Sequence, residues 1–249
     1  MLHLIQPDWP VPARVRCCIT TRAGGVSEGS YAGLNLATHV GDAPEHVARN
    51  RALLRTAAGL PAEPRWLEQV HGTAVAEFRE PGAAVPRADG AVTGTPGVVL
   101  AVMTADCLPV LLADVAGRRV AALHAGWRGL ADGMLEAGVA AMERPGSALY
   151  AYLGPAIGPA AFEVGGEVRE RFLAWQPAAA DAFRPSPAGR WLADLYALAR
   201  LRLQAAGVPA AQIFGGELCT YAQAERFFSY RREGVTGRMA SLIWLEAAS

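Results

Sequence analysis

Three residues of metal-binding type stand at or near the ends of apolar segments. His71 ends "WLEQVH", Cys107 lies in "TADCLPVLLAD" and His124 ends "RRVAALH". Two imidazoles and one thiolate suit Zn²⁺ or copper, and three protein ligands leave a fourth coordination position for water or substrate. A metal held by these three residues would form a catalytic site. The spacing matches no compact CxxC pattern, however, and composition alone favours a buried cysteine and hydrogen-bonded core histidines.

A hairpin would bring two of these residues together. If residues 114–117 form its loop, the register places position 107 opposite position 124. Pro109 has no amide hydrogen for the strand ladder and should interrupt the strand near Cys107. We therefore expect Cys107 and His124 to meet at the ends of adjacent strands, where small residues such as Ala105 and Gly126 leave room for a ligand.

The segment "GDAPEHVARNRALLRTAAGL" is typical of a helix. Asp42 can cap its start, and Glu45 follows three residues later as in a capping box. Pro44 suits the first turn and Gly59 suits the exit.

Two polar residues of this helix are expected to face the core. At about 100° per residue, Asn50 and Arg51 share one face with Val47 and Leu54. One interpretation is a buried, hydrogen-bonded or ion-paired arginine that fixes the packing. The other is that the helix borders a polar cavity in which Asn50 and Arg51 contact an anionic substrate.

Further polar residues beside the metal candidates could support chemistry. Asp106 precedes Cys107 and is a candidate for proton transfer or for supporting the metal ligand; the alternative is a turn aspartate that bonds its own backbone. Arg128 follows His124 by one turn, where a helix N-terminus would favour an anion.

Three further polar residues are either substrate contacts or solvent-exposed residues at the ends of strands. Tyr230 and Arg231 in "FFSYRREGVTGRM" precede an expected hairpin turn, and Arg22 lies in "TTRAGG". Each is either a substrate contact or a polar residue at a solvated strand end.

The surrounding elements predict an α/β, or α+β layered, fold. Apolar runs that read as strands are "RVRCCITT", "GVVLAVMT", "RRVAALH", "ALYAYLG" and "MASLIWL". Further helices are expected over residues 129–143 and 192–207. We expect one catalytic domain over residues 1–249, with a mixed β-sheet core flanked by helices.

Composition restricts the class of partner. The 249 residues carry 23 basic and 23 acidic side chains, so no net field attracts nucleic acid or an anionic membrane. The chain shows no signal peptide and no membrane-spanning run, and four cysteines do not make a disulfide framework at this length. We expect a cytoplasmic protein with reduced thiols and small-molecule substrates; whether it forms a homodimer is left open.

Segments in order along nearly the whole chain resemble the bacterial laccase-domain family. They are "TTRAGGVSEGSYAGLNLATHVGD", "NRALL", "WLEQVHG", "TADCLPVLLAD", "AALHAGWRGL", "LGPAIGPAAFEVGGEV", "LADLYALARLRL" and "ERFFSYRREGVTGRMASLIWL". The resemblance implies that His71, Cys107 and His124 are the metal ligands. Ala160 and Ala161 stand where some relatives carry cysteines, so we assign them no function.

Members of that family have been described as polyphenol oxidases, purine nucleoside phosphorylases and peptidoglycan editing factors. The resemblance implies a zinc-dependent purine nucleoside enzyme, which phosphorolyses adenosine, inosine and methylthioadenosine and also deaminates adenosine. An open zinc site can activate water and orient the substrate, while arginines hold phosphate.

Two alternatives stay open. A copper-dependent polyphenol oxidase is disfavoured because five histidines cannot furnish several copper clusters, although copper could replace zinc at a single site. A cysteine hydrolase would use Cys107 as nucleophile and His124 as base on an amide bond, for instance in mis-made peptidoglycan precursors. Metal content separates these interpretations, since a zinc-bound thiolate is a poor nucleophile.

Overall fold

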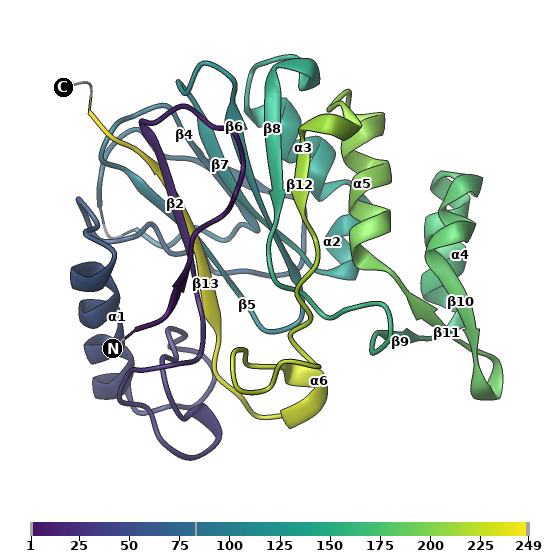
Figure 1. Ribbon diagram of the computed structural model, residues 1–249, viewed down its shortest axis with the longest axis horizontal. Helices are drawn as coiled ribbons and strands as arrows, with labels where there is room; N and C mark the ends of the chain where they lie inside the picture. The colour runs from purple at the N-terminus through teal and green to yellow at the C-terminus, as the bar shows by residue number, and fades with distance from the viewer. Residues whose placement is uncertain (1, 83, 248–249) are drawn as a thin grey trace.

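Two β-sheets pack face to face at the centre of the structure (Figure 1). A computed structural model describes residues 2–82 and 84–247. The strands of the first sheet are β1 (Leu4–Ile5), β2 (Val15–Thr20), β5 (Val99–Thr104) and β13 (Met239–Leu245). They are antiparallel, in the order β1-β2-β13-β5.

The second sheet has strands of mixed direction. Its members are β3 (Val75–Glu77), β4 (Gly90–Thr93), β6 (Leu108–Asp114), β7 (Val120–Ala125), β8 (Leu149–Leu153) and β12 (Ile213–Gly215). Their order is β12-β8-β6-β7-β4-β3, with β12 parallel to β8 and β3 parallel to β4. The remaining pairs are antiparallel.

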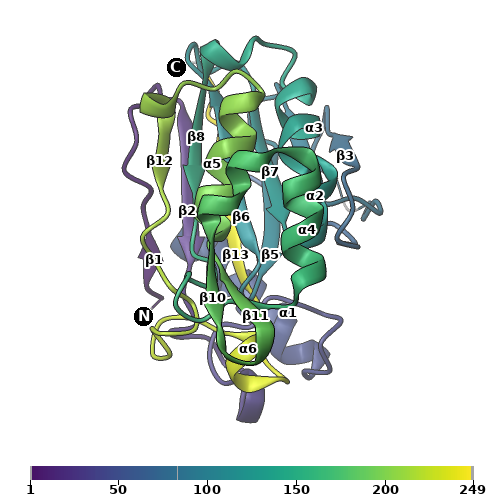
Figure 2. The same ribbon diagram turned by 90° about the vertical axis from the view of Figure 1, so that its right-hand side faces the viewer.

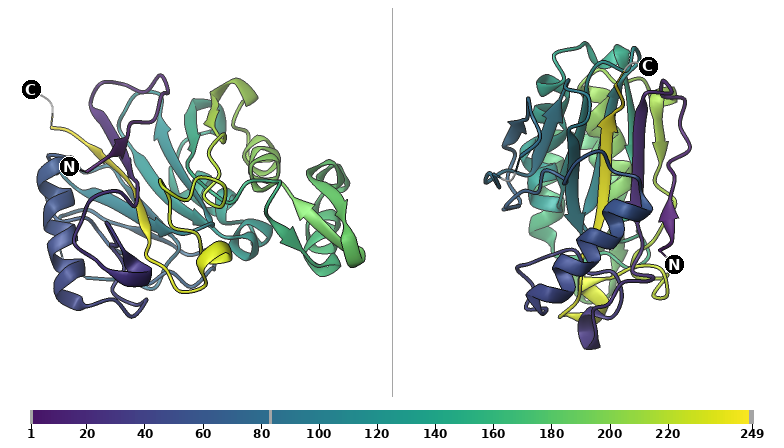
Figure 3. Two further views of the ribbon diagram at one scale, coloured as in Figure 1. Left: turned by 60° about the horizontal axis from the view of Figure 1, so that its bottom comes forward. Right: turned by 90° about the vertical axis from the view of Figure 1, so that its left-hand side faces the viewer.

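The described residues form six α-helices: α1 (Pro44–Ala57), α2 (Trp127–Asp132), α3 (Met134–Ala141), α4 (Gly166–Trp175), α5 (Leu195–Ala205) and α6 (Tyr230–Glu233). Four of them, α1, α2, α3 and α5, cover the outer faces of the two sheets. Figure 2 shows α2, α3 and α5 against the six-stranded sheet, where their apolar residues share one core cluster with β6, β7 and β8. Figure 3 shows α1 across the four-stranded sheet, so the layers run helix, sheet, sheet, helix.

This layering explains why the central strands read as unbroken apolar runs. In β5, Leu100 and Val102 belong to the core between the two sheets, whereas Val99, Ala101 and Met103 belong to the core under α1. Because successive side chains point to opposite faces, a strand buried on both faces needs apolar residues at nearly every position. The predicted α/β fold with helices flanking a mixed sheet is confirmed. The structure has two packed sheets, whereas a single mixed sheet was expected.

The hairpin of β6 and β7 has a different register from the one predicted. Leu108 pairs with Ala125 and Pro109 with His124, a shift of two residues. The loop is longer because the Asp114 amide bonds Arg119 and its carboxylate accepts from the Arg118 amide. A two-residue shift leaves every side chain on its expected face, so the proximity of Cys107 and His124 survives the correction.

Pro109 does not interrupt the strand, as had been expected. It is the second residue of β6, and its carbonyl accepts a hydrogen bond from Gly154. A proline is tolerated here because its missing amide hydrogen falls where the ladder begins.

The start of α1 corrects the predicted cap. Ala43 is the N-cap and offers no side-chain bond, while the Asp42 carboxylate accepts from the side chains of Ser27 and Asn35. Asp42 therefore holds the loop before the helix and leaves the helical amides alone. Pro44 at the first position and Gly59 at φ +58° after the exit match the prediction.

Two further differences concern the helices. The helix expected over residues 129–143 is split into α2 and α3 at Gly133, whose φ of +102° is disfavoured for residues with a side chain. The sequence also gave no signal for a small third sheet of β9 (Glu163–Val164), β10 (Phe183–Ser186) and β11 (Arg190–Ala193). Together with α4, this third sheet projects from the main body, at the right of Figure 1.

Every helix in the described part of the chain is too short or too polar to cross a bilayer.

The start of α5 provides a test of this local structure. The Asp194 carboxylate accepts from the amides of Tyr196 and Ala197. We expect Asp194→Ala to lower the free energy of unfolding by about 1 kcal/mol, since two amides lose their partner. Asp194→Asn keeps an acceptor and should cost much less. Urea denaturation of both variants measures the difference, and equal losses would contradict the cap.

Candidate metal centre and its cavity

A cavity of about 430 Å³ opens at one end of the two-sheet core. It lies where β5 and β7 end and β6 begins, so the loops that leave these strands form its floor. Part of the wall is apolar: Met103, Ala105, Ile157 and Phe162 line it. The remaining lining residues are polar or ionisable, and they include all three predicted metal ligands.

The side chains of His71, Cys107 and His124 converge in this cavity, as the sequence predicted. One ligand atom from each lies within 4.8 Å of the others, and Cys107 Sγ is 3.7 Å from His71 Nε2. The two imidazole rings meet edge to face, with centroids 4.8 Å apart. No other group of three such residues clusters in this way among residues 2–82 and 84–247.

Strand ends and a strained loop deliver the three side chains. His124 is the penultimate residue of β7, and Cys107 directly precedes β6. His71 lies in the loop before β3 with φ +62°, a conformation that a residue with a Cβ adopts only when its surroundings impose it.

The buried carboxylate of Asp89 imposes that conformation, and sequence reasoning missed it. Its oxygens accept hydrogen bonds from the backbone amides of Val70, His71 and Gly72 at 2.7–3.2 Å. Oδ1 also lies 2.8 Å from His124 Nδ1. One carboxylate therefore fixes the loop of one histidine and the ring of another, and it leaves His124 Nε2 as that ring's free nitrogen.

Burial and charge act on this group in opposite directions. Burial alone would raise the pKa of Asp89, but hydrogen bonds from His124 and the loop amides lower it below its ordinary value. Burial also raises the pKa of Cys107, yet the nearby His124 and His71 lower it to about 6. Conversely, burial lowers the pKa of His124, while Cys107 and Asp89 raise it to about 9. A thiolate beside an imidazolium is the favoured state of the metal-free site near neutral pH.

The donor set fits a zinc ion. Tetrahedral zinc with bonds of about 2.3 Å to sulfur and about 2.0–2.1 Å to nitrogen separates these atoms by roughly 3.6 Å, close to the 3.7 Å between Cys107 and His71. Gly126 provides the room, because a Cβ there would lie 2.8 Å from the His71 ring and 3.1 Å from the Cys107 sulfur. Three donors instead of four is the ligand number of catalytic zinc sites.

Asp106 lines the cavity but does not behave as the turn aspartate of the alternative interpretation. Its carboxylate accepts from the Thr220 hydroxyl (2.6 Å), the Ser229 hydroxyl (3.0 Å) and the Arg231 amide (2.7 Å). These partners lie more than a hundred residues away and hold Asp106 at φ +89°. Asp106 therefore joins the Cys107 loop to the segment around α6, a positioning role that its hydrogen bonds explain.

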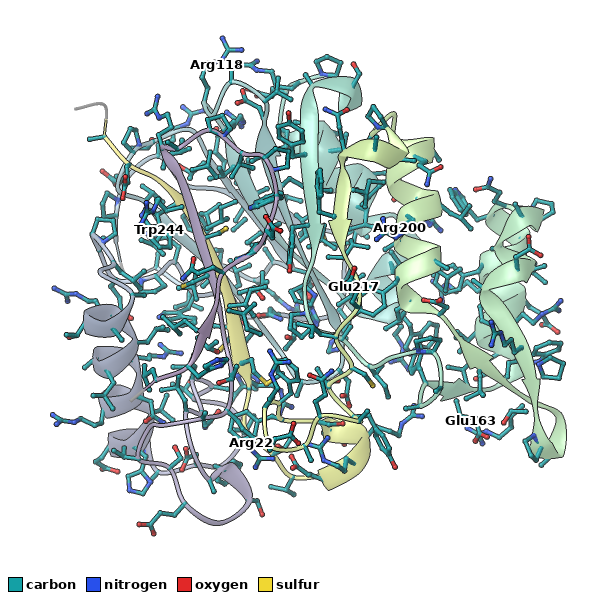
Figure 4. The ribbon with its side chains drawn as sticks, viewed as in Figure 1. Arg22, Arg118, Glu163, Arg200, Glu217 and Trp244 are labelled. Carbon is teal, nitrogen blue, oxygen red and sulfur yellow. The ribbon has the colours of Figure 1, made fainter. Side chains whose placement is uncertain are left out.

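Tyr230 and Arg231 both line the cavity. They begin the short helix α6, which Ser229 caps, and not the approach to a hairpin turn as expected. The Tyr230 side chain is 60% exposed at the cavity mouth. Arg231 Nη1 donates to the carbonyl of Glu163, which Figure 4 marks at the base of the projecting sheet.

The inward-facing pair of α1 lies outside the cavity. Asn50 is fully buried, and its amide group bonds the loop of residues 26–35. Arg51 donates from Nε and Nη2 to the Leu36 carbonyl, stacks over Trp66 at 4.0 Å and lines a separate depression. The prediction that both border the metal cavity is wrong, and the packing interpretation of this helix face holds.

Arg22 and Arg128 also lie outside the cavity lining. Arg22, labelled beside α6 in Figure 4, pairs with Glu233 at 2.7 Å and lies over Phe228. Arg128 is exposed and stacks over its neighbour Trp127. Both arginines are occupied by local partners, so the structure does not support the predicted substrate contacts.

Besides the buried Asp89, the sequence analysis missed two ionisable residues that line the cavity, His39 and Arg238. His39 lies in the loop before α1, and Arg238 immediately precedes β13. The available signal was their position in "ATHVGD" and "TGRMASLIWL", where each is a basic residue beside a glycine turn. Only the pairing of β13 with β5 brings residue 238 to the metal loop.

Comparisons with known proteins identify similar sequences and a similar fold. Residues 16–246 match the family described as multi-copper polyphenol oxidoreductase laccase. Purine nucleoside phosphorylase YfiH of Escherichia coli is 54% identical over 98% of this chain and 100% of its own length. A purine nucleoside phosphorylase of Pseudomonas aeruginosa is 54% identical, covering 97% of this chain and 98% of that protein. A crystal structure of a DUF152 protein of Neisseria meningitidis superposes with a TM-score of 0.92 at 52% identity, covering 98% and 99% of the two chains.

Asp89→Asn tests the carboxylate that orients the histidines. An amide has one acceptor oxygen in place of two and would turn N–H groups toward the loop amides. We expect zinc affinity to fall about tenfold to a hundredfold. The matched control is Asp114→Asn, which alters another buried carboxylate at the opposite end of the hairpin. Competition with a chromophoric chelator measures both affinities; equal affinity in the two variants would contradict the assignment.

The metal-free protein should show a reactive thiolate at one position. Because the pKa of Cys107 is lowered to about 6, its alkylation by iodoacetamide should rise with pH through about 6 and stay high at pH 7. Burial raises the pKa of Cys17 to about 11 and that of Cys18 to about 12, so these thiols should stay unmodified. Peptide mass spectrometry locates the label. A Cys107 rate that rises only near pH 9 would refute the thiolate.

Proposed function

The chain belongs to the family described as multi-copper polyphenol oxidoreductase laccase, and we propose that it acts as a zinc-dependent purine nucleoside phosphorylase. Its substrates would be adenosine, inosine and methylthioadenosine, with slower deamination of adenosine at the same site. The observation that carries the proposal is the three-donor set of His71, Cys107 and His124 in a cavity with both apolar and cationic walls. The printed names of the relatives support the reaction class.

The cavity has the size and lining that a nucleoside requires. Its volume of about 430 Å³ falls within the usual range of ligand sites. Phe162, Ile157 and Met103 offer apolar contacts for a purine ring, and Tyr230 adds an aromatic face at the mouth.

The residues around the donor set would prepare it for chemistry. Zinc, when bound, supplies a Lewis acid that can orient the substrate and favour charge development on it. Asp89 holds the His124 ring through Nδ1 and fixes the loop that presents His71. Asp106 precedes Cys107 in its loop and accepts a hydrogen bond from the amide of Arg231. This bond holds Cys107 and Arg231 at a fixed position relative to each other.

Oxidase chemistry with several copper ions has less support. The described residues form one cluster able to hold a metal ion, and an enzyme with several copper ions needs more imidazoles than this cluster contains. A single copper ion could replace zinc at these nitrogen and sulfur donors.

A cysteine hydrolase is a second candidate that one observation favours. Cys107, His124 and Asp89 form a chain in which the carboxylate lies 2.8 Å from the imidazole and the imidazole interacts with the thiol. This is the order of nucleophile, base and orienting acid in hydrolases. In the metal-free protein Cys107 could attack an amide bond, for instance in a mis-made peptidoglycan precursor.

We propose that residues 1–249 act as one catalytic domain in the cytoplasm. All four cysteines are free, and the Cys107 thiol must stay reduced to bind a metal. The proposed partners are a purine nucleoside and phosphate, without nucleic acid or membrane.

Metal content and product formation test the proposal. The purified protein should bind one zinc ion per chain and, with adenosine or inosine and phosphate, should release free purine and ribose 1-phosphate. Cys107→Ala and His124→Ala should lose most of the metal and the reaction while remaining folded, because a core of this size does not depend on metal. Element analysis, chromatography of the products and thermal melts measure these outcomes.

Two results would contradict the proposal. Stoichiometric zinc in both variants would exclude the assigned ligands. No ribose 1-phosphate from fully metallated enzyme would exclude phosphorolysis and favour the hydrolase.

A further inference from the structure

Arg238 is a cationic residue that the fold fixes on the cavity wall. It directly precedes β13, whose first residue, Met239, pairs with Thr104 at the end of β5. Its backbone amide donates to Asn35 Oδ1, and its carbonyl accepts from the Leu36 amide. The backbone is thereby anchored beside the loop that carries Cys107.

Arg238 has no directly paired carboxylate: burial lowers its pKa, and the charges of Cys107 and Asp106 in the same cavity raise it only in part. Its Nη1 donates to the carbonyls of Thr236 and Gly237, which fixes one edge of the guanidinium. Within residues 2–82 and 84–247, no carboxylate oxygen lies within 4.0 Å of it, whereas Arg232 and Arg202 each contact a glutamate. A half-buried cation that lacks a directly paired anion is costly, and an anionic ligand would offset that cost.

The cavity as a whole favours an anion. Asp106 is the one carboxylate among its described lining residues, and its oxygens are engaged by two hydroxyls and the Arg231 amide. Two arginines, Arg231 and Arg238, line the same cavity. Arg231 is exposed on α6 and bonds the Glu163 carbonyl, whereas Arg238 is half-buried and bonds carbonyls through Nη1 alone.

His39 adds a second donor on the same wall. It lines the cavity, and its pKa is lowered first by burial and then by the positive charges of Arg238 and Arg51. A neutral imidazole beside a guanidinium can donate one N–H to an oxyanion.

We propose that Arg238 and His39 form the subsite that binds the phosphate co-substrate, a tetrahedral oxyanion. This inference rests on the proposed phosphorylase function and assigns its second substrate to residues that the sequence analysis did not select. It also replaces Arg51, which lines a separate depression.

Calorimetric titration of the zinc-loaded protein with inorganic phosphate, at constant ionic strength, tests the subsite. Arg238→Met removes the charge and keeps much of the side-chain length. We expect it to weaken phosphate binding about tenfold to a hundredfold and to raise the phosphate KM by the same factor. The nucleoside KM should change little. Zinc content is measured for each variant, so that a lost metal is not mistaken for a lost anion site.

Arg51→Met is the matched control. Arg51 is also a half-buried arginine that bonds a backbone carbonyl and has no carboxylate within 4.0 Å in the described chain. It should keep the wild-type phosphate affinity. Arg238→Lys and His39→Gln keep the test valid if Arg238→Met does not fold; each should weaken phosphate binding severalfold.

A titration with adenosine 5′-monophosphate separates free phosphate from a phosphate ester. Binding of the nucleotide without binding of inorganic phosphate would overturn the inference. So would wild-type phosphate affinity in the folded, metallated Arg238 variants, or an equal loss in Arg51→Met. Arg238-dependent phosphate binding without ribose 1-phosphate formation would instead refute the proposed function and leave the subsite standing. Ribose 1-phosphate formation with an unchanged phosphate KM in Arg238→Met would refute the subsite alone.

Discussion

The buried carboxylate of Asp89 holds the candidate metal centre together. It accepts hydrogen bonds from three backbone amides in the loop of His71 and lies within hydrogen-bond distance of the His124 ring. One carboxylate therefore positions two metal-ligand candidates that come from distant parts of the chain. A fully buried carboxylate is tolerated only when it is saturated with donors. The loop must therefore take the strained conformation seen at His71, and the ring must present its other nitrogen.

The layered fold explains why the site lies where it does. The apolar cores on both faces of the central strands leave little room for polar side chains along their length. Polar groups can gather only where the strands end, and β5, β6 and β7 share one such end at the cavity. The apolar residues that stabilise the sheets thus also direct ionisable residues to the strand ends, and one of these ends holds the metal-ligand candidates.

Arginines in this chain differ in role because their neighbours differ. Arg51 has a carbonyl and an aromatic ring as partners, and Arg22 has a glutamate. Arg238 has two carbonyls on one edge and the cavity beside it. An arginine can bind a ligand when some of its guanidinium N–H groups have no hydrogen-bond partner in the protein and no carboxylate pairs with its charge.

The sequence by itself determined the central strands and the α/β fold class, because apolar periodicity is a local property. It also supplied the three metal-ligand candidates, but only the resemblance to a known family favoured them over buried core residues. It could not determine which helix face meets the cavity: Arg51 has an inward position, yet its partners come from other segments. Asp89 and Arg238 look unremarkable in sequence, since their roles depend on contacts made across strand pairings. Hydrogen bonds and charges between distant segments form only once the sheets have assembled, so the tertiary structure alone decided the partners of the metal ligands and the cationic wall.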